Sequence, residues 1–474
     1  VDLVQEQPGA LGLYLMTPTG TIDLSEALYA TEERSLSGGG GAREIRFVAE
    51  APDDFRYPDL RIERTYRIDP NQYDMQMDLT ISGIPNFRRD HQIAIAWDRG
   101  IPSVDHKIAR YGETKEAIAL LADNLVKDGF GGASFGCGCG GSPKGDMQES
   151  YQGIIRWAGV KGKYFAGLLV PQEEIDGVFQ TRVIGARTEA GMRLIIPLEY
   201  EGATQESFRV FAGPLDHGII GRLDEELDVD LGRIENMGPS ILRPVAVAIQ
   251  WFLVNGYKVI PNYGIVILLL AIVVRVIFHP LNVRALRSQQ KMQALKPKLD
   301  EINEKYKDDP QLRTKKTMEL HKTEGINPVG GCLPLLPQMP VFFALYSVMM
   351  NAIELRHASF VFWIQDLSSP DKVGEIAGVP IHILPLFMGA AQYLQQKSMP
   401  TDPKQAPMMM MMPLIMVFFL YSLPSGLVLY WTATSLVTWA QQKMTKPPAP
   451  QPAAAETASK PAGTPKPKKR GKKS

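Results

Sequence analysis

Residues 263–280 of the chain read YGIVILLLAIVVRVIFHP. The run Ile265–Val274 has no polar side chain, and it ends at Arg275, five residues before Pro280. A helix over residues 263–278 would be about 24 Å long, against roughly 30 Å for the hydrocarbon core of a bilayer. The stretch therefore predicts a short membrane-spanning helix with a cation near one end.

The spacing leaves two interpretations of Arg275 open. Its long stem could carry the guanidinium to the nearby interface, where it would only anchor the helix. Alternatively, it is a cation in a wet cavity of a helix bundle, where a low dielectric strengthens its attraction for acidic or polar segments of another chain. Gln338, Gln392, Thr434 and Ser435 could line such a cavity, or each could make an ordinary hydrogen bond between helices.

The other apolar segments and the positive charges agree on one topology. Further spans are expected at residues 331–350, 381–394 and 408–439, the last divided into two by Pro424-Ser425-Gly426. Five spans result within residues 261–444. Loops rich in Lys and Arg favour the cytoplasm. Residues 283–326, the loop with Lys397 and Lys404, and the tail all fall on that side.

Residues 283–326 hold eleven Lys or Arg and seven Asp or Glu, with apolar residues at helical spacing. This pattern predicts two antiparallel helices, with a tight tip at Asp308-Asp309-Pro310. The tail, residues 445–474, is rich in Pro, Ala and Lys and is expected to be disordered. Its basic cluster, with Lys468, Lys469 and Arg470, could bind anionic lipid or ribosomal RNA, or only mark topology and aid solubility.

Residues 1–235 differ from the membrane part in composition. Short period-two segments, such as residues 60–66 and 92–97, alternate with turn signals and predict an antiparallel β-sandwich. A helical stretch near residues 219–234 follows. The apolar segment at residues 240–260 is too short to span and has Trp251, so it predicts a helix on the membrane surface.

The first domain is expected outside the cytoplasm, yet Val1 is no initiator Met and no signal-peptide pattern follows it. An upstream signal or anchor helix is therefore expected. Cys137 and Cys139 lie in a glycine-rich run, where a loop without function, redox work or metal binding are all open. No nucleophile and base, phosphate loop or metal spacing occurs in the sequence, so we expect neither an enzyme nor a cofactor or metal.

Several motifs together resemble the YidC/Oxa/Alb insertase family, in order and at family-like spacing over about residues 240–445. They are Asn327–Pro334, Gln338–Tyr346, Val273–Arg275 with His279–Leu281, Glu354–Arg356, Phe362–Leu367 and Pro424–Trp431. Weaker motifs, Lys163–Phe165 and Phe208–Pro214, resemble the periplasmic domain of the Gram-negative branch, whose first transmembrane helix is absent here.

The resemblance implies a fold of several domains. Residues 1–235 would be an all-β periplasmic super-sandwich with a linking helix, and residues 240–260 an amphipathic interfacial helix. Residues 261–444 would form an α-helical membrane domain of five transmembrane helices in the bacterial inner membrane. The hairpin 283–326 and the tail would then be cytoplasmic.

The resemblance also implies a mechanism for inserting nascent inner-membrane proteins and helping them fold. Five helices would enclose a hydrophilic groove open to cytoplasm and lipid, lined by Arg275, Gln338, Gln392 and Trp431. Some relatives have a hydroxyl residue one turn before the arginine, where this chain has Ala271. Burial of the client's apolar residues would drive insertion without a nucleotide.

Implied partners are nascent membrane proteins, membrane lipids, the Sec translocon, the ribosome and the signal recognition machinery, with the protein active as a monomer, alone or with Sec. The hairpin would recruit clients or targeting factors through Arg284, Lys291, Asp308 and Asp309. A transporter or channel would instead predict ionisable residues on several spans or an inverted repeat. A chaperone without insertion activity is open as an added role.

Overall fold

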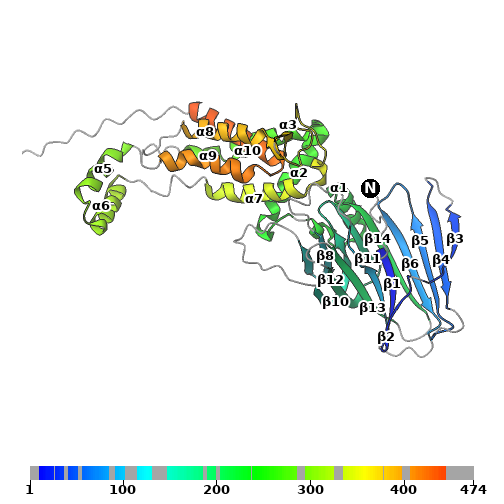
Figure 1. The fold of residues 1–474 in the computed structure, drawn as a ribbon. Coiled ribbons are helices and arrows are strands. Elements are labelled where there is room, and N and C mark those ends of the chain that lie inside the picture. Colours follow the sequence, from blue (N-terminus) through cyan, green and yellow to red (C-terminus); the bar gives the residue numbers. More distant parts are fainter. Residues whose placement is uncertain are drawn as a thin grey trace, which may run out of the picture. The chain divides into compact units, whose positions relative to one another are not determined.

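The chain is described here from a computed structural model, in which a β-rich domain is followed by helices (Figure 1). Two compact units are distinguished, and each is described by itself: unit 1 is residues 1–270, 339–386 and 418–431, and unit 2 is residues 271–338, 387–417 and 432–474. The structure describes residues 10–25, 27–36, 41–51, 56–84, 91–101, 115–130, 147–184, 189–198, 203–235, 237–284, 294–324, 335–376, 378–397 and 406–444.

Within those ranges, unit 1 contains an antiparallel sheet of 14 strands. The strands are β1 (Ala10–Thr17), β2 (Gly20–Asp23), β3 (Ala30–Ser35), β4 (Arg43–Glu50), β5 (Arg61–Ile68), β6 (Asp74–Ser82), β7 (Gln92–Trp97), β8 (Lys115–Leu121), β9 (Asn124–Phe130), β10 (Met147–Lys161), β11 (Phe165–Pro171), β12 (Ile175–Ile184), β13 (Glu189–Pro197) and β14 (Thr204–Pro214). The hydrogen-bonded order is β2-β1-β7-β13-β12-β10-β11-β14-β6-β5-β4-β3, and β8 and β9 branch from β10.

Two apolar cores share the central strands of this sheet. Alternate residues of a strand point to opposite faces. In β10, Trp157 enters one core and Ala158 the other, and in β14 Phe211 and Val210 divide in the same way. All these side chains are fully buried. Central strands with both faces covered explain why the apolar residues of β11 run together rather than alternate.

The second core is closed by the segment that follows the sheet. Helix α1 (His217–Leu227) and the 3-10 turn η2 (Leu231–Ile234) place Leu223 and Leu231 against Trp157. The predicted helical stretch near residues 219–234 is present as two short helices, which are separated at Asp228. Asp228 adopts a left-handed backbone, and the Asp224 carboxylate accepts the N–H of Leu231, which starts the next turn.

The helical part carries the segments with the apolar sequence. Its elements are η3 (Ser240–Leu242), α2 (Arg243–Val259), α3 (Tyr263–Ile277), α5 (Lys296–Lys305), α6 (Pro310–Thr323), α7 (Leu335–Asn351), η5 (Ile353–Leu355), α8 (Leu384–Lys397), α9 (Ala406–Leu420) and α10 (Ser425–Met444), with the strands β15 (Lys372–Ile376) and β16 (Val379–His382) between α7 and α8. In the described part of the chain, no helix combines membrane-spanning length with sustained apolar character.

Glycines allow two close approaches among these elements. A Cβ atom on Gly264 of α3 would meet the ring of Phe360, and one on Gly389 of α8 would lie 2.6 Å from Val417 of α9. The first contact holds α3 against the loop after α7 within unit 1. The second holds α8 against α9 within unit 2. Both positions need a residue without a side chain.

Helices α5 and α6 form a pair on their own (Figure 1). Asp309 caps α6 by accepting the N–H of Leu312, and Lys298 of α5 bonds Glu324 beyond α6 at 2.8 Å. No described residue of α6 is buried, so the pair has no core of its own. Ion pairs at such exposed positions contribute little stability.

The predicted β-rich domain followed by a helical region is confirmed. The five spans and the cytoplasmic side of the hairpin stay predictions. The polar loop at residues 354–379 contains the strand β15, which pairs with β16.

Candidate functional site

Arg275 lies in the last turn of α3 and is half-buried. It belongs to unit 2, as do Gln338 near the start of α7 and Gln392 on α8. Gln338 is half-buried, and Gln392 is only 9% exposed. Three of the four residues predicted to line a groove therefore fall in one compact unit and carry polar groups that are at least half-buried.

The glutamines of α8 include one that the sequence analysis did not single out. Gln392 and Gln396 are four residues apart, so they share one face of the helix. The Oε1 atom of each is buried and has no hydrogen-bond partner among the described residues. Burying an amide oxygen without a partner costs about 1–3 kcal/mol. This face of α8 therefore favours contact with water or another polar group.

Helix α10 carries a similar polar stripe. Thr434, Thr438 and Gln442 follow one another at intervals of four, and Ser435 lies beside them. Thr434 and Ser435 are buried, and the Thr438 hydroxyl donates to the carbonyl of Thr434 at 2.6 Å. Both amide atoms of Gln442 are buried with no partner among the described residues. The spacing of four was a signal that could have identified Thr438 and Gln442 from the sequence.

Trp431 is placed differently from the other predicted lining residues. It belongs to unit 1, where its ring meets the ring of Phe342 of α7 edge-on at 5.0 Å. The aromatic contact accounts for its half-buried position. The structure therefore joins Trp431 to α7, and its place in a groove stays a prediction.

The predicted recruitment residues are only partly described. Arg284 and Asp308 are exposed, and Asp309 caps α6. Lys291 of the hairpin lies outside the described residues, as do the tail residues Lys468, Lys469 and Arg470 and all three cysteines, Cys137, Cys139 and Cys332. No group of three or more candidate metal ligands occurs in the residues that the structure describes.

A second polar cluster in unit 1 joins α1 to the turn after α7. The Nδ1 atom of His217 lies 3.1 Å from Glu235, and the His217 N–H donates to Glu354 at 3.4 Å. The hydrogen bond to Glu235 raises the pKa of His217, despite partial burial. Burial raises the pKa of Glu354, whose Oε2 atom has no described partner. We call His217, Glu235 and Glu354 the outer cluster.

The outer cluster should lose stability as pH rises. A raised pKa means that His217 and Glu354 each bind a proton more tightly in the folded state. The stability that these two groups contribute is therefore complete below their pKa values in the unfolded state. It is lost as the pH rises through their pKa values in the folded state. Hydrogen exchange of the α1 amides should be slower at about pH 5 than at about pH 8, beyond the intrinsic change in exchange rate.

The Glu354→Gln variant should flatten part of this pH dependence, because an amide does not titrate. Glu226→Gln is the matched control, since Glu226 lies on α1 but is half-exposed and bonds only Arg209 among the described residues. Equal pH dependence in the native chain and in Glu354→Gln would show that Glu354 does not contribute.

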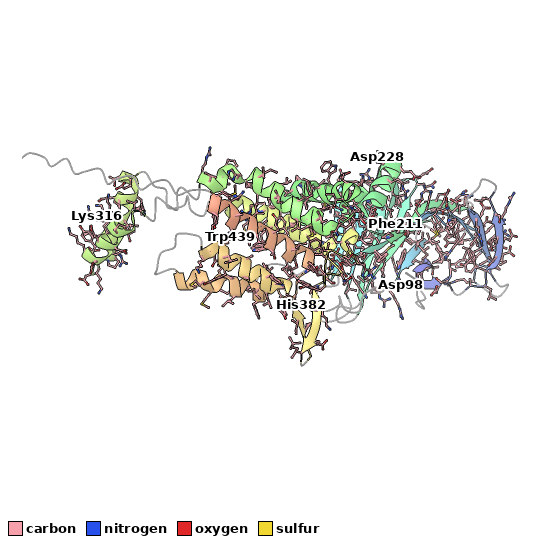
Figure 2. The ribbon with its side chains drawn as sticks, turned by 90° about the horizontal axis from the view of Figure 1, so that it is seen from above. Asp98, Phe211, Asp228, Lys316, His382 and Trp439 are labelled. Atoms are coloured by element: carbon pink, nitrogen blue, oxygen red, sulfur yellow. The ribbon has the colours of Figure 1, made fainter. Side chains whose placement is uncertain are left out.

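The outward surfaces of the helices are strongly apolar. Phe418 and Phe419 of α9 are 78% and 67% exposed, and Leu414 is similarly open. Contiguous exposed apolar side chains of this size mark contact with a membrane or a partner. Figure 2 shows α8, α9 and α10 running side by side, with their side chains spread outward. A β-rich domain joined to such helices defines a class of membrane proteins with a large domain outside the bilayer.

Comparisons with known proteins give the family. Residues 3–238 match the YidC periplasmic domain model, and residues 255–451 match the 60Kd inner membrane protein model. A membrane protein insertase YidC of Syntrophus aciditrophicus is 31% identical over 454 residues, covering 93% of this chain and 76% of the relative. The YidC of Citrifermentans bemidjiense is 37% identical over 457 residues, covering 93% and 78%.

Among solved structures, an active YidC insertase with its first transmembrane domain resolved has a TM-score of 0.40 and 19% identity, and the match covers 92% of this chain and 83% of that one. The sequence matches alone carry the assignment. This chain belongs to the YidC family of membrane protein insertases, which are inner-membrane proteins with a periplasmic domain. The predicted family is thus confirmed, as is the prediction that the chain is not an enzyme.

Proposed function

We propose that unit 2 provides a hydrophilic groove through which nascent membrane segments enter the bilayer. The observation that carries this proposal is the set of buried amide groups without described partners at Gln392, Gln396 and Gln442. Such groups are normally satisfied by water or by a bound polar chain. A groove that holds water between clients, and the polar end of a client during insertion, satisfies them in both states.

Arg275 would supply the positive charge of this groove. The residues around it on α3 are apolar, so its guanidinium is the charged group of that helix. An acidic or polar outer segment of a client would be attracted to it, because a site with few surrounding waters screens charge poorly. The client's apolar part would then move into lipid, driven by burial of about twenty apolar residues.

The proposed membrane arrangement has α3, α7, α8, α9 and α10 as five crossing helices. The exposed Leu414, Phe418 and Phe419 support it, since side chains of this kind are stable in lipid and costly in water. Helices of 14–20 residues favour a bilayer that is thin around the protein. The α2 helix, with Trp251 63% exposed, would lie at the interface.

We also propose that the hairpin of α5 and α6 faces the cytoplasm and receives clients or targeting factors. Its exposed helices have no buried residues in α6, so its surface is available to a partner. Arg284, Lys291, Asp308 and Asp309 would contribute charge there. The basic tail residues Lys468, Lys469 and Arg470 would contact the ribosome or anionic lipid, and the insertase would act as a monomer, alone or with the Sec translocon.

Site-specific photocrosslinking tests the groove. A stalled nascent chain with one apolar segment should crosslink to a probe at position 396, because the Gln396 oxygen is buried on the polar face of α8. A probe at position 395 is the matched control, since Gln395 is the neighbouring glutamine and its amide atoms are not among the buried unpaired ones. Equal crosslinking at 395 and 396, or none at 396, would contradict the groove path.

A further inference from the structure

The segment between α7 and α8 contains a small β-hairpin with an apolar tip. We call β15 and β16 together the outer hairpin. Ile376 pairs with Val379 at its end, and their side chains are 68% and 60% exposed. Val373, beside the irregular register near Lys372, is also exposed. Aliphatic side chains this open are unfavourable in water, so the tip requires a covering surface.

The two faces of the outer hairpin differ in character. Residues paired across an antiparallel ladder point to the same side. The pair Ile376 and Val379 therefore shares one face with the pair Gly374 and Ile381, whereas the intervening Glu375 lies on the other face. Glu375 bonds Lys372 at 2.6 Å, so these two charges are matched with each other. The tip thus has two aliphatic side chains on one face, and Glu375 with Pro380 on the other.

The base of the outer hairpin is held in place by Asp371, which is 4% exposed. Its Oδ2 atom accepts hydrogen bonds from the N–H groups of Ile383 and Leu384 at 3.1 and 2.7 Å, and from the Trp363 indole at 3.0 Å. His382 donates from Nδ1 to the Asp371 carbonyl at 3.1 Å. These bonds fix the direction in which the strands leave the start of α8.

Tyr421, just beyond α9, holds the other strand. Its hydroxyl donates to the Pro380 carbonyl at 2.9 Å and accepts the backbone N–H of His382 at 3.3 Å. The ring centroids of Tyr421 and His382 are 4.8 Å apart. Tyr421 lies two residues after the exposed Phe419 in the chain. Tyr and Trp are the residues enriched at membrane–water interfaces. The outer hairpin therefore starts where the apolar surface of α9 ends.

We propose that the outer hairpin lies on the outer leaflet of the bilayer, with Ile376 and Val379 inserted at the level of the lipid headgroups. This inference rests on the proposed membrane arrangement. Figure 2 shows the hairpin at His382 standing out sideways from the neighbouring helix ends, as a surface-lying element would. A lipid surface suits a tip of small aliphatic residues, because protein interfaces are usually centred on Trp, Tyr or Arg.

This contact would fix the height of the helix ends relative to the outer leaflet. Short helices are sensitive to their depth in the bilayer, since mismatch is relieved by tilting or by thinning. A rigid base with an inserted tip resists both tilt and sinking. The outer hairpin would thus limit how deeply the neighbouring helix ends sit in the outer leaflet.

Fluorescence quenching in vesicles tests the proposal. The full chain carrying Cys137→Ser, Cys139→Ser and Cys332→Ser is labelled with an environment-sensitive dye at Ile376→Cys. It is reconstituted in phosphatidylethanolamine and phosphatidylglycerol vesicles containing lipids spin-labelled near the headgroup. We expect a blue-shifted emission and strong quenching at position 376. The matched label, at Glu375→Cys on the opposite face, should stay water-like.

A third label, at Phe418→Cys, distinguishes failure of the hairpin proposal from failure of the proposed membrane arrangement. If position 418 is quenched while 376 and 375 are equally water-like, the hairpin proposal is wrong and the membrane arrangement stands. If position 418 is not quenched, both are overturned. If position 376 is shielded from an aqueous quencher only in native inner-membrane vesicles, the tip binds a protein, which also overturns lipid contact.

A charged tip gives an independent check that does not depend on a label at position 376. Ile376→Asp with Val379→Asp should abolish lipid quenching of a dye at Gly374→Cys, which lies on the same face of the hairpin in open space, because two carboxylates oppose insertion beside anionic lipid. Both positions are exposed, so the fold should be unaffected. Unchanged quenching in this variant would show that the apolar pair does not hold the hairpin on the membrane.

Discussion

Arg275→Ala is expected to lower insertion of clients with an acidic outer segment by roughly ten- to hundredfold. That range corresponds to the loss of about 1.5–3 kcal/mol, the usual contribution of a hydrogen bond to a charged group. Arg275 is half-buried in the last turn of an otherwise apolar helix, and partial burial weakens the screening of its charge. Complementation of a depletion strain, and insertion into vesicles containing the purified variant, measure the effect.

A pair of clients that differ only in the charge of the outer segment provides the control. An anchor at the interface would position α3 for every client, so its loss would reduce insertion of acidic and neutral clients equally. A groove cation predicts a larger loss for the acidic client and partial recovery in Arg275→Lys, whose ammonium keeps the charge without the planar fork. Full activity of Arg275→Ala with the acidic client would disprove the required charge.

Trp157→Ala should destabilise the β-rich domain by about 3–5 kcal/mol, the usual range for a large core aromatic. Trp157 is completely buried in the second core, and its indole N–H donates to the carbonyl of Val229 at 3.1 Å. The variant therefore leaves both a cavity and a carbonyl without its donor. Hydrogen exchange of the β10 and β11 amides in the full chain should report the loss.

Ile154→Ala is the matched control, because Ile154 lies three residues earlier on β10 and is 43% exposed. Substitutions at such surface positions usually change stability by about 0.5 kcal/mol or less. Similar exchange rates of the β10 and β11 amides in the two variants would mean that these strands do not depend on the second core. Release of α1 alone, with the sheet amides unchanged, would place Trp157 outside the folding core of the domain.

The sequence predicted strands at residues 60–66 and 92–97 because alternation with period two is a local signal, and β5 and β7 lie there. It did not predict that β10, β11 and β14 are covered on both sides. That property depends on α1 and η2 returning to the sheet, which no local pattern records. The break at Asp228 was missed for a similar reason, since the flanking residues keep a helical apolar pattern.

The candidate site was likewise only partly predictable from the sequence. Arg275 stood out because a lone cation in an apolar run is conspicuous in a sequence. Gln396 and Gln442 did not, because glutamines near helix ends are ordinary until their amide atoms prove to be buried. The outer hairpin was also missed, since Ile376 and Val379 sit in a polar loop whose pairing only the structure shows.

The bond from Trp157 to Val229 has a mechanical consequence. Lys161, at the end of β10, also donates to the Ile234 carbonyl at 2.9 Å, and its ammonium lies 3.2 Å from Glu116. The segment leaving the β-rich domain is therefore fastened to the sheet at both ends of η2. A force transmitted along the chain from α2 would act on these hydrogen bonds and would not bend the segment. Among the described residues that follow these bonds, Gly238 has a positive φ, a backbone conformation that glycine adopts without strain. The chain can change direction there at low cost.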